Sequence, residues 1–142
     1  MESFFISLKL SADFDSYDDE VLLEKNYQSF FKPILTFLYS HENFLLTIEF
    51  TGYQLHYYSR KHPESIDLLR ELYGRKQIEI LGSGYYNPVF PILFPVDRSG
   101  QIEKMTSELR SSTGKRPYGM YLFGSIWDPS LITTIQSCGL EY

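Results

Sequence analysis

The sequence predicts an α/β fold in which parallel strands are joined by helical crossovers. Short and nearly continuous apolar runs, which are typical of buried parallel strands, alternate with stretches whose apolar residues recur at helical spacing. This strand–helix order occurs four times along the 142 residues. Repeated crossovers of this kind place their strands parallel in one sheet, and the length suits a single domain over residues 1–142.

The strands are expected where apolar residues form short runs bounded by glycine or polar residues. These runs are residues 4–10, 44–50, 78–81 and 119–123. Leu140 to Tyr142 resembles the beginning of a fifth strand. The chain is therefore expected to be either part of a larger barrel or a domain whose last strand is very short.

The helices are expected where apolar residues recur at helical spacing. These stretches are residues 27–38, 54–60, 62–74, 97–110 and 128–138. Pro33 interrupts the first, so we expect a kink or a second helix there. Gly74 and Gly139 end two of the others, and Asp128-Pro129 is a sequence that commonly opens a helix, with Asp128 as the N-cap.

Charge and composition exclude several classes of protein. The net charge is −5 and basic pairs are scattered, which argues against a nucleic-acid partner. The one cysteine, Cys138, cannot form an internal disulfide, and it falls on the apolar side of a helix, where a small buried side chain is expected. The sequence shows neither a basic signal-peptide start nor the ~20 apolar residues of a membrane span, so we expect a cytoplasmic protein with no membrane partner. The oligomeric state is left open.

Two features that resemble functional motifs have simpler explanations. Gly82-Ser83-Gly84 follows a strand, but the third glycine of a dinucleotide-binding loop is missing, so we expect these glycines to serve a sharp turn. The histidines share no metal-ligand spacing and are expected on the surface or in loops. They are His41, His56 and His62.

Carboxylates near the carboxyl ends of the expected strands are the candidates for a site. Asp13 and Asp15 follow the first strand, where a solvated loop also accounts for them. The N-cap role explains Asp128. Glu49 lies inside the second strand, where a buried acid is costly unless it faces a polar lumen or finds a partner. Glu49 is therefore the acid that a purely structural explanation fits least well.

Several stretches together resemble the N-terminal part of glycoside hydrolase family 57, which includes α-amylases, amylopullulanases and 4-α-glucanotransferases. Residues 63–95, "PESIDLLRELYGRKQIEILGSGYYNPVFPILFP", resemble the family's Pro-Glu-Tyr-Ile-Asp-Leu-Leu-Arg helix and Gly-Phe-Tyr-Glu-Pro loop. Residues 97–105, "DRSGQIEKM", resemble its Asp-Arg-x-x-Gln-Ile helix. Residues 114–131, "GKRPYGMYLFGSIWDPSL", resemble its fourth strand and the following turn. The resemblance covers nearly the whole chain.

This resemblance implies a partial (β/α)7-type barrel of the glycoside hydrolase/deacetylase type, with residues 1–142 as its N-terminal part. It implies an α-glucan or another oligosaccharide as the ligand, and neither a metal nor an organic cofactor. In such retaining enzymes one carboxylate attacks the anomeric carbon and a second acts as acid/base, and the two carboxyl groups lie ~5–5.5 Å apart.

The resemblance also implies which positions line the site. The family's Glu-Arg-Val-Trp-Glu-Pro motif is matched by residues 124–129, so the nucleophile position holds Gly124 and this chain supplies no catalytic residue. The family's substrate-binding Glu is matched by Asn87, which can still hydrogen-bond a hydroxyl. A strand-two histidine is matched by Glu49, and Asp13 falls within the stretch that matches His-x-His-Gln-Pro. The acid/base aspartate belongs to a later strand. The expected substrate-binding residues are Asp13, Glu49, Tyr85, Tyr86, Asn87 and Trp127.

Three functions follow from these observations. The first is the N-terminal segment of an α-glucan enzyme that cannot hydrolyse glycosides in the usual way, because of Gly124. The second is a non-catalytic, degenerate barrel that binds an α-glucan or a protein partner, with Tyr85, Tyr86 and Trp127 either stacking on sugars or packing the barrel mouth. The third is an unrelated barrel enzyme that binds a metal through Asp13, Asp15 and Glu49.

Overall fold

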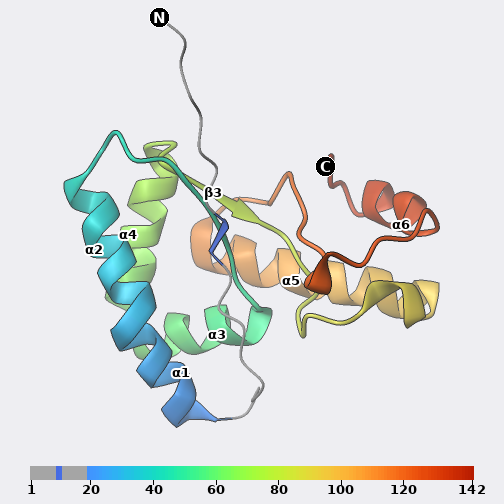
Figure 1. Ribbon diagram of the computed structural model, residues 1–142, viewed down its shortest axis with the longest axis horizontal. Helices are drawn as coiled ribbons and strands as arrows, with labels where there is room; N and C mark the ends of the chain where they lie inside the picture. The colour runs from blue at the N-terminus through green and yellow to red at the C-terminus, as the bar shows by residue number, and fades with distance from the viewer. Residues whose placement is uncertain (1–8, 11–18) are drawn as a thin grey trace, which may run out of the picture.

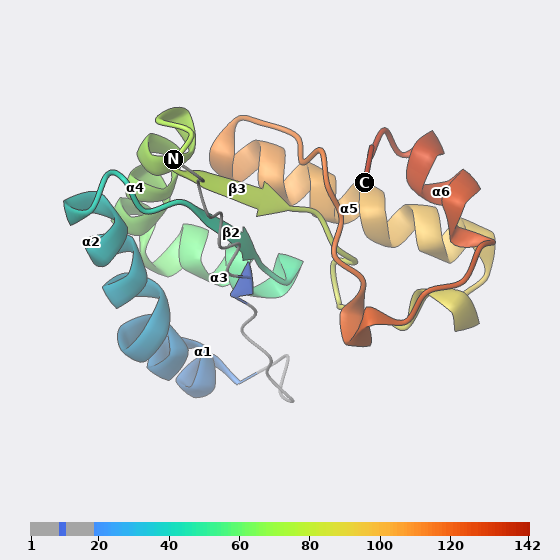
Figure 2. The same cartoon turned by 45° about the horizontal axis from the view of Figure 1, so that its top comes forward.

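The computed structural model describes residues 9–10 and 19–142, and its centre is a three-stranded parallel sheet (Figures 1 and 2). The strands are β1 (Lys9–Leu10), β2 (Leu46–Glu49) and β3 (Ile78–Leu81), in the order β1-β2-β3. Both pairs are parallel. The prediction of an α/β fold with parallel strands and helical crossovers is therefore confirmed.

The helices connect these strands and then continue beyond β3. The elements are α1 (Glu20–Asn26), the π-helical turn η1 (Tyr27–Phe31), α2 (Lys32–Ser40), α3 (Gly52–Lys61), α4 (Pro63–Gly74), the short 3-10 turn η2 (Phe90–Ile92), α5 (Pro95–Thr113), a second 3-10 turn η3 (Phe123–Ser125) and α6 (Leu131–Ser137). Every helical stretch expected from the sequence is present. The described helices include none that is both long enough and apolar enough to cross a membrane.

The interruption expected at Pro33 takes the form of a wider helical turn. The residues of η1 lie between α1 and α2, and Pro33 is the second residue of α2. Proline has no N–H to donate to the carbonyl four residues earlier, so a regular α-helix cannot continue unchanged through this position. The chain therefore stays helical but changes its hydrogen-bonding pattern just before the proline.

The expected fourth strand, residues 119–123, is wrong as a strand. Met120 forms one isolated parallel bridge with Gly82, and the chain then enters η3. The backbone there has φ of +66° at Gly124 and +55° at Ser125, which ends any extended pairing. The last residues do run beside this segment, because the amide of Met120 donates to the carbonyl of Tyr142 at 2.6 Å. Of the first expected strand, residues 4–8 lie outside the described part of the chain.

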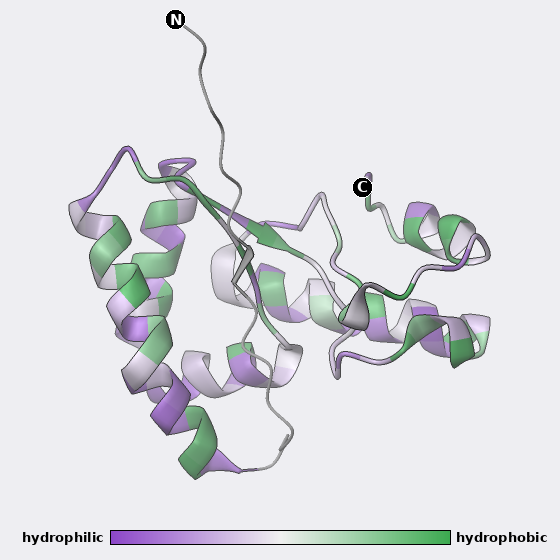
Figure 3. Ribbon diagram, viewed as in Figure 1, coloured by the Kyte–Doolittle hydropathy of each residue, from purple (hydrophilic) through white to green (hydrophobic). Residues whose placement is uncertain are grey.

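The main core lies between the sheet and the helices that cover one of its faces. Leu46 and Ile48 of β2 and Ile78 and Ile80 of β3 are almost fully buried, and they form one apolar cluster with side chains of α2–α5. Figure 3 shows hydrophobic and hydrophilic residues alternating along these helices. Such a pattern allows one side of a helix to be buried against the core.

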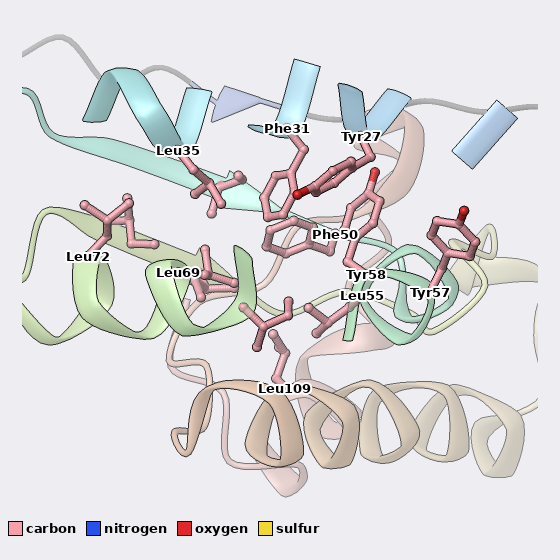
Figure 4. Close-up of a cluster of buried hydrophobic side chains, with 14 of the residues drawn as sticks. Tyr27, Phe31, Leu35, Phe50, Leu55, Tyr57, Tyr58, Leu69, Leu72 and Leu109 are labelled. Atoms are coloured by element: carbon pink, nitrogen blue, oxygen red, sulfur yellow. The ribbon is translucent and has the colours of Figure 1, made fainter. Parts of the chain in front are cut away.

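Aromatic rings fill one end of this core. Figure 4 shows Phe31, Phe50 and Tyr58 close together, with the rings of Phe31 and Tyr58 stacked at 4.8 Å. A second, smaller apolar cluster packs α6 onto α5. Its buried members are Phe90, Ile102, Leu131, Cys138 and Leu140, which confirms Cys138 as a small buried side chain. Burial raises the pKa of this thiol.

Candidate functional site

The carboxyl ends of the parallel strands meet at one edge of the sheet, the edge at which α/β folds usually place functional groups. Two hydrogen bonds join the segments that leave β2 and β3. The hydroxyl of Ser83 donates to the carbonyl of Phe50 at 3.0 Å, and the amide of Gly52 donates to the carbonyl of Tyr85 at 2.9 Å. The Gly82–Met120 bridge brings the third segment to the same edge. The segments that carry the expected site positions therefore leave the sheet at one edge.

Glu49 ends β2 at this edge and is buried, with 3% of its surface exposed. Phe31 and Tyr58 line the small cavity beside it. Because side chains alternate along a strand, Glu49 shares the sheet face of Thr47, opposite to the face that packs on the helices. The position of Glu49 agrees with the expectation, whereas its binding role stays a prediction. Asp13 and Asp15 lie outside the described residues.

Tyr85 and Tyr86 are adjacent in sequence but have different surroundings. Tyr85 is buried and packs directly over Gly52, where an added Cβ would lie within 2.1 Å of the ring. Tyr86 is 43% exposed, and the two rings meet edge to face at 4.8 Å. Tyr85 therefore serves mainly as core packing, while the ring of Tyr86 is partly exposed to solvent.

Two side chains of α5 hold Tyr86 in place. The amide of Tyr86 donates to Oε1 of Gln101 at 3.0 Å. Nζ of Lys104 donates to the Tyr86 hydroxyl at 3.1 Å and lies 4.1 Å from the centroid of the Tyr85 ring. A cation over an aromatic face and a charge-assisted hydrogen bond both restrict the rings. The exposed ring of Tyr86 is therefore fixed by its neighbours rather than free to rotate.

Asn87 follows in a left-handed conformation, with φ of +49°, and is 8% exposed. Its amide donates to the carbonyl of Gly84 at 3.0 Å, which closes the turn. Oδ1 of Asn87 is buried and accepts no hydrogen bond from the residues that the structure describes. A buried amide oxygen without a donor is costly, so this atom is suited to accept a hydrogen bond from a hydroxyl that approaches it.

The turn at residues 123–127 matches the expected nucleophile position but has no acid. Gly124 is exposed, and a Cβ added to it would meet only Ile126, at 3.4 Å. The space that a side chain would occupy is thus open, and the positive φ explains why glycine suits the position. Trp127 is 55% exposed.

The expectation that Asp128 caps a helix is only partly right. The helix α6 begins at Leu131, three residues later, and Ser130 precedes it. Oδ1 of Asp128 accepts a hydrogen bond from the amide of Ser130 at 2.8 Å. Hydrogen bonding from the Ser130 side chain, then from its backbone amide, with a smaller contribution from the charge of Arg98, lowers the pKa of Asp128. The carboxylate therefore stabilises the turn before the helix instead of its first turn.

Arg98 joins the two parts of this region and was not expected as a site residue. Its guanidinium donates to the carbonyls of Pro91 and Leu93, both at 3.0 Å, and to the hydroxyl of Ser130 at 3.0 Å. The Asp-Arg-x-x-Gln-Ile resemblance contains both Arg98 and Gln101, so the sequence signal existed. Neither its partners nor its role could be inferred from that signal.

A second group of ionisable side chains lies away from this edge, around His62. Its ring lies at the α3–α4 junction, with Nε2 2.7 Å from Oε2 of Glu24 and Nδ1 3.5 Å from Oε1 of Glu64. The ring also stacks on Tyr27. His62 lies between two helices, as expected, but it is mostly buried rather than on the surface, while His41 and His56 are exposed. This group ties α1 to the α3–α4 junction.

Two other features do not support a site. A hollow of about 640 Å³ lies at the opposite, amino-terminal edge of β2 and β3, lined by Thr47, Glu79, Lys115 and Tyr118 among others. We do not assign the site to it, because it lies away from the strand ends that carry the candidate residues. Within residues 9–10 and 19–142, no group of three or more His, Cys, Asp or Glu side chains is arranged to hold a metal. The metal alternative depends on Asp13 and Asp15 and stays untested.

Comparison with known proteins places this geometry in a family. The family model described as Glycosyl hydrolase family 57 matches residues 2–142. The chain is 32% identical over 123 residues to Alpha-amylase 1 of Dictyoglomus thermophilum, covering 87% of this chain and 18% of that protein. It is 31% identical over 121 residues to the 4-alpha-glucanotransferase of Thermococcus kodakarensis, covering 85% of this chain and 18% of that protein.

Solved structures agree with the sequence comparisons. The 4-alpha-glucanotransferase of Thermococcus litoralis superposes with a TM-score of 0.82 at 27% identity, over 87% of this chain and 20% of that one. The alpha-amylase AmyC of Thermotoga maritima, at 13% identity, shares the fold with a TM-score of 0.75, over 94% of this chain and 38% of that one. The chain thus spans about a fifth of the length of the curated relatives it matches. On the family match and the shared fold, this chain belongs to glycosyl hydrolase family 57.

Proposed function

We propose that this chain forms part of an α-glucan-binding surface in a family 57 protein and does not supply the nucleophile for glycoside hydrolysis. The observation that carries the binding part is the combination of two half-exposed rings, Tyr86 and Trp127, with the buried oxygen of Asn87. All three belong to segments that leave the same edge of the sheet.

The chemistry of these groups suits a sugar chain. Aromatic faces offer a flat apolar surface against which a sugar ring can pack, and the amide oxygen can accept a hydrogen bond from a sugar hydroxyl. The hydrogen bonds from Gln101 and Lys104 hold Tyr86 in advance, which reduces the entropy lost on binding. The relatives named alpha-amylase and 4-alpha-glucanotransferase support an α-glucan as the class of ligand.

The absence of a nucleophile rests on Gly124. A retaining mechanism needs two carboxyl groups ~5–5.5 Å apart on either side of the scissile bond, and glycine has no carboxyl group. Asp128, the nearest acid in sequence, is bound to the amide of Ser130. Glu49 is buried at the end of β2, on a different segment from the turn that the resemblance matches to the family nucleophile. A shift of several ångströms loses the geometry of attack.

We further propose that residues 1–142 are the N-terminal part of a larger (β/α)7-type barrel. The parallel order β1-β2-β3 and the similarity to about a fifth of each relative support this proposal.

Calorimetric titration with maltooligosaccharides tests the binding proposal. We expect heat of binding from the unmodified chain, and an affinity about three- to tenfold lower for Tyr86→Ala or Trp127→Ala, from the loss of one stacking ring. Tyr118→Ala is the matched control, because Tyr118 is 63% exposed and lines the hollow at the opposite edge. The absence of heat at millimolar ligand would exclude sugar binding. Equal losses in all three variants would place the sugar elsewhere.

Release of reducing ends from maltooligosaccharides by the full-length protein tests the catalytic proposal. We expect no release above that of buffer. Turnover that survives replacement of Glu49 and Asp128 would show that the chain is active and that Gly124 is not at the nucleophile position. Turnover that one of these replacements removes would also contradict the proposal, and would identify a different catalytic acid.

A further inference from the structure

The guanidinium of Arg98 connects two loop segments that are far apart in sequence. Its Nε and Nη2 donate to the carbonyls of Leu93 and Pro91, which follow the loop of Tyr86 and Asn87. Its Nη1 lies 3.0 Å from the hydroxyl of Ser130 and 3.5 Å from its carbonyl, three residues after Trp127. A single side chain therefore connects the stretch that follows Tyr86 and Asn87 with the stretch that follows Trp127.

The surroundings of Arg98 make these bonds strong. The residue is 8% exposed, so its charge is largely removed from water and has to be satisfied by hydrogen bonds. Its partners are two main-chain carbonyls and the backbone and hydroxyl of Ser130, a set that matches the fixed fork of an arginine. A lysine ammonium is a single point of charge and cannot reach all of them.

The helix α5 supplies further support from the same face. Gln101 and Ile102 follow Arg98 by three and four positions, so both lie on the same side of the helix as Arg98. The side chain of Gln101 accepts a hydrogen bond from the amide of Tyr86 at 3.0 Å. Its main-chain carbonyl accepts one from the amide of Tyr85 at 3.3 Å. The early turns of α5 thus contact both loop segments.

We propose that Arg98 is the positioning residue that fixes the turn of Gly124 and Trp127 relative to the loop of Tyr86 and Asn87, so that a glucan meets a preformed surface. Removal of this connection loosens both segments together, although neither contains Arg98. The part that concerns the glucan rests on the function proposed above, whereas the coupling of the two segments does not depend on it.

The competing explanation is apolar packing. Phe90, Ile102 and Leu131 belong to one buried cluster, which also lies between the two segments. If that cluster alone sets their arrangement, a side chain that fills the same space without hydrogen bonds will be sufficient. Arg98→Met tests this directly, and Arg98→Lys tests whether a charge without the fork is sufficient. Arg110→Lys, at an exposed position on the same helix, is the control.

Hydrogen exchange of backbone amides measures the coupling. In both Arg98 variants we expect the amides of Leu93 and Leu131 to exchange about tenfold faster or more, the effect of losing one charge-assisted hydrogen bond. Arg110→Lys should change neither. Faster exchange in only one segment, or unchanged exchange in Arg98→Met, would overturn the proposal. If Arg98→Met does not fold, as judged by circular dichroism, the same comparison made with Arg98→Lys decides.

Titration of the same variants with maltooligosaccharides tests the consequence for binding. We expect affinity to fall about tenfold in the Arg98 variants and to stay unchanged in Arg110→Lys, in line with the exchange effect. If the amides exchange faster in the Arg98 variants but the affinity for maltooligosaccharides is unchanged, Arg98 has no role in binding. The coupling of the two segments would still hold. If the unmodified chain binds no glucan, the function proposed above fails, and hydrogen exchange still decides whether Arg98 couples the two segments.

Discussion

The imidazole of His62 stacks on the phenol ring of Tyr27, with the ring centroids 3.4 Å apart and the planes inclined by 10°. Hydrogen bonds surround this pair: Glu24 contacts the imidazole, and the Tyr27 hydroxyl lies 2.6 Å from Oγ of Ser65. The contact joins η1, which follows α1, to the α3–α4 junction, so its loss should affect the stability of the fold rather than the candidate site.

Replacement of His62 by alanine should destabilise the chain by about 2 kcal/mol, because it removes a charge-assisted hydrogen bond and a stacked ring from a partly buried position. Urea unfolding measures the change. His56→Ala is the matched control, since the His56 side chain is 48% exposed and its pairing with Glu108 at 3.4 Å is a surface interaction. Equal losses in the two variants would contradict a structural role specific to His62.

Stability should fall as the pH drops below about 4.5, in part because of Glu24. Hydrogen bonds from Gln28 and His62 lower the pKa of Glu24 from 4.5 to about 2. A carboxylate with a lowered pKa in the folded state contributes stability above its unfolded pKa, and this contribution is lost as the pH falls towards the folded value. Because the Glu24 side chain is 40% exposed, solvent reduces the effect.

Urea unfolding at several pH values between 6 and about 2 tests this dependence. The midpoint for Glu24→Gln should change less over this interval than the midpoint for the unmodified chain. Asp67→Asn is a suitable control, because Asp67 forms a surface pair with Arg70. Parallel curves for Glu24→Gln and the unmodified chain would show that other acids dominate the pH dependence.

Gly52→Ala should destabilise the chain by about 1–3 kcal/mol, the usual cost of overpacking. Its Cβ would lie 2.1–2.5 Å from three atoms of the Tyr85 ring, so the ring has to move. Because Tyr85 precedes Tyr86, glucan affinity should fall as well. Gly74→Ala, where no atom lies within 4 Å of the added Cβ, is the control for both measurements. Unchanged stability would mean that Tyr85 can leave its place without cost.

Gly124→Ala and Gly100→Ala should have opposite effects on the melting temperature. At Gly124 the backbone has φ of +66°, so a side chain costs about 1–2 kcal/mol although the space is open. Gly100 lies inside α5 with nothing near its added Cβ, and alanine there should stabilise the helix by about 1 kcal/mol. Shifts in the same direction would contradict the backbone conformation at one of the two positions.

The parallel strands β2 and β3 could be predicted from short, largely apolar runs with helical stretches between them. Residues 119–123 gave the same signal for another reason. Met120 and Leu122 pack against the second apolar cluster, so they are apolar without belonging to a strand ladder. A short apolar run in a sequence does not indicate whether its residues pair in a sheet or pack against a helix. The sequence alone therefore could not distinguish a fourth strand from an apolar segment without strand pairing.

The candidate site shows a similar division. The assignments of the nucleophile position to Gly124, and of the substrate-binding acid's position to Asn87, followed from the resemblance alone and stay predictions. The burial of Tyr85 could not be predicted in this way. It depends on the space left by Gly52, which lies more than thirty positions earlier in the sequence. The partners of Arg98 are mainly main-chain carbonyls, which every residue carries, so no pattern of side chains could have identified them.

The pairing of the strands also determines the order in which the chain can fold. Leu46 pairs with Ile78 and Gly82 with Met120, so each strand contact closes a loop of about thirty residues or more. Helices need only local contacts, and α3 and α4 can therefore form and meet before any strand is in place. We therefore expect the sheet edge that carries the candidate residues to be completed late in folding, after these long loops have closed.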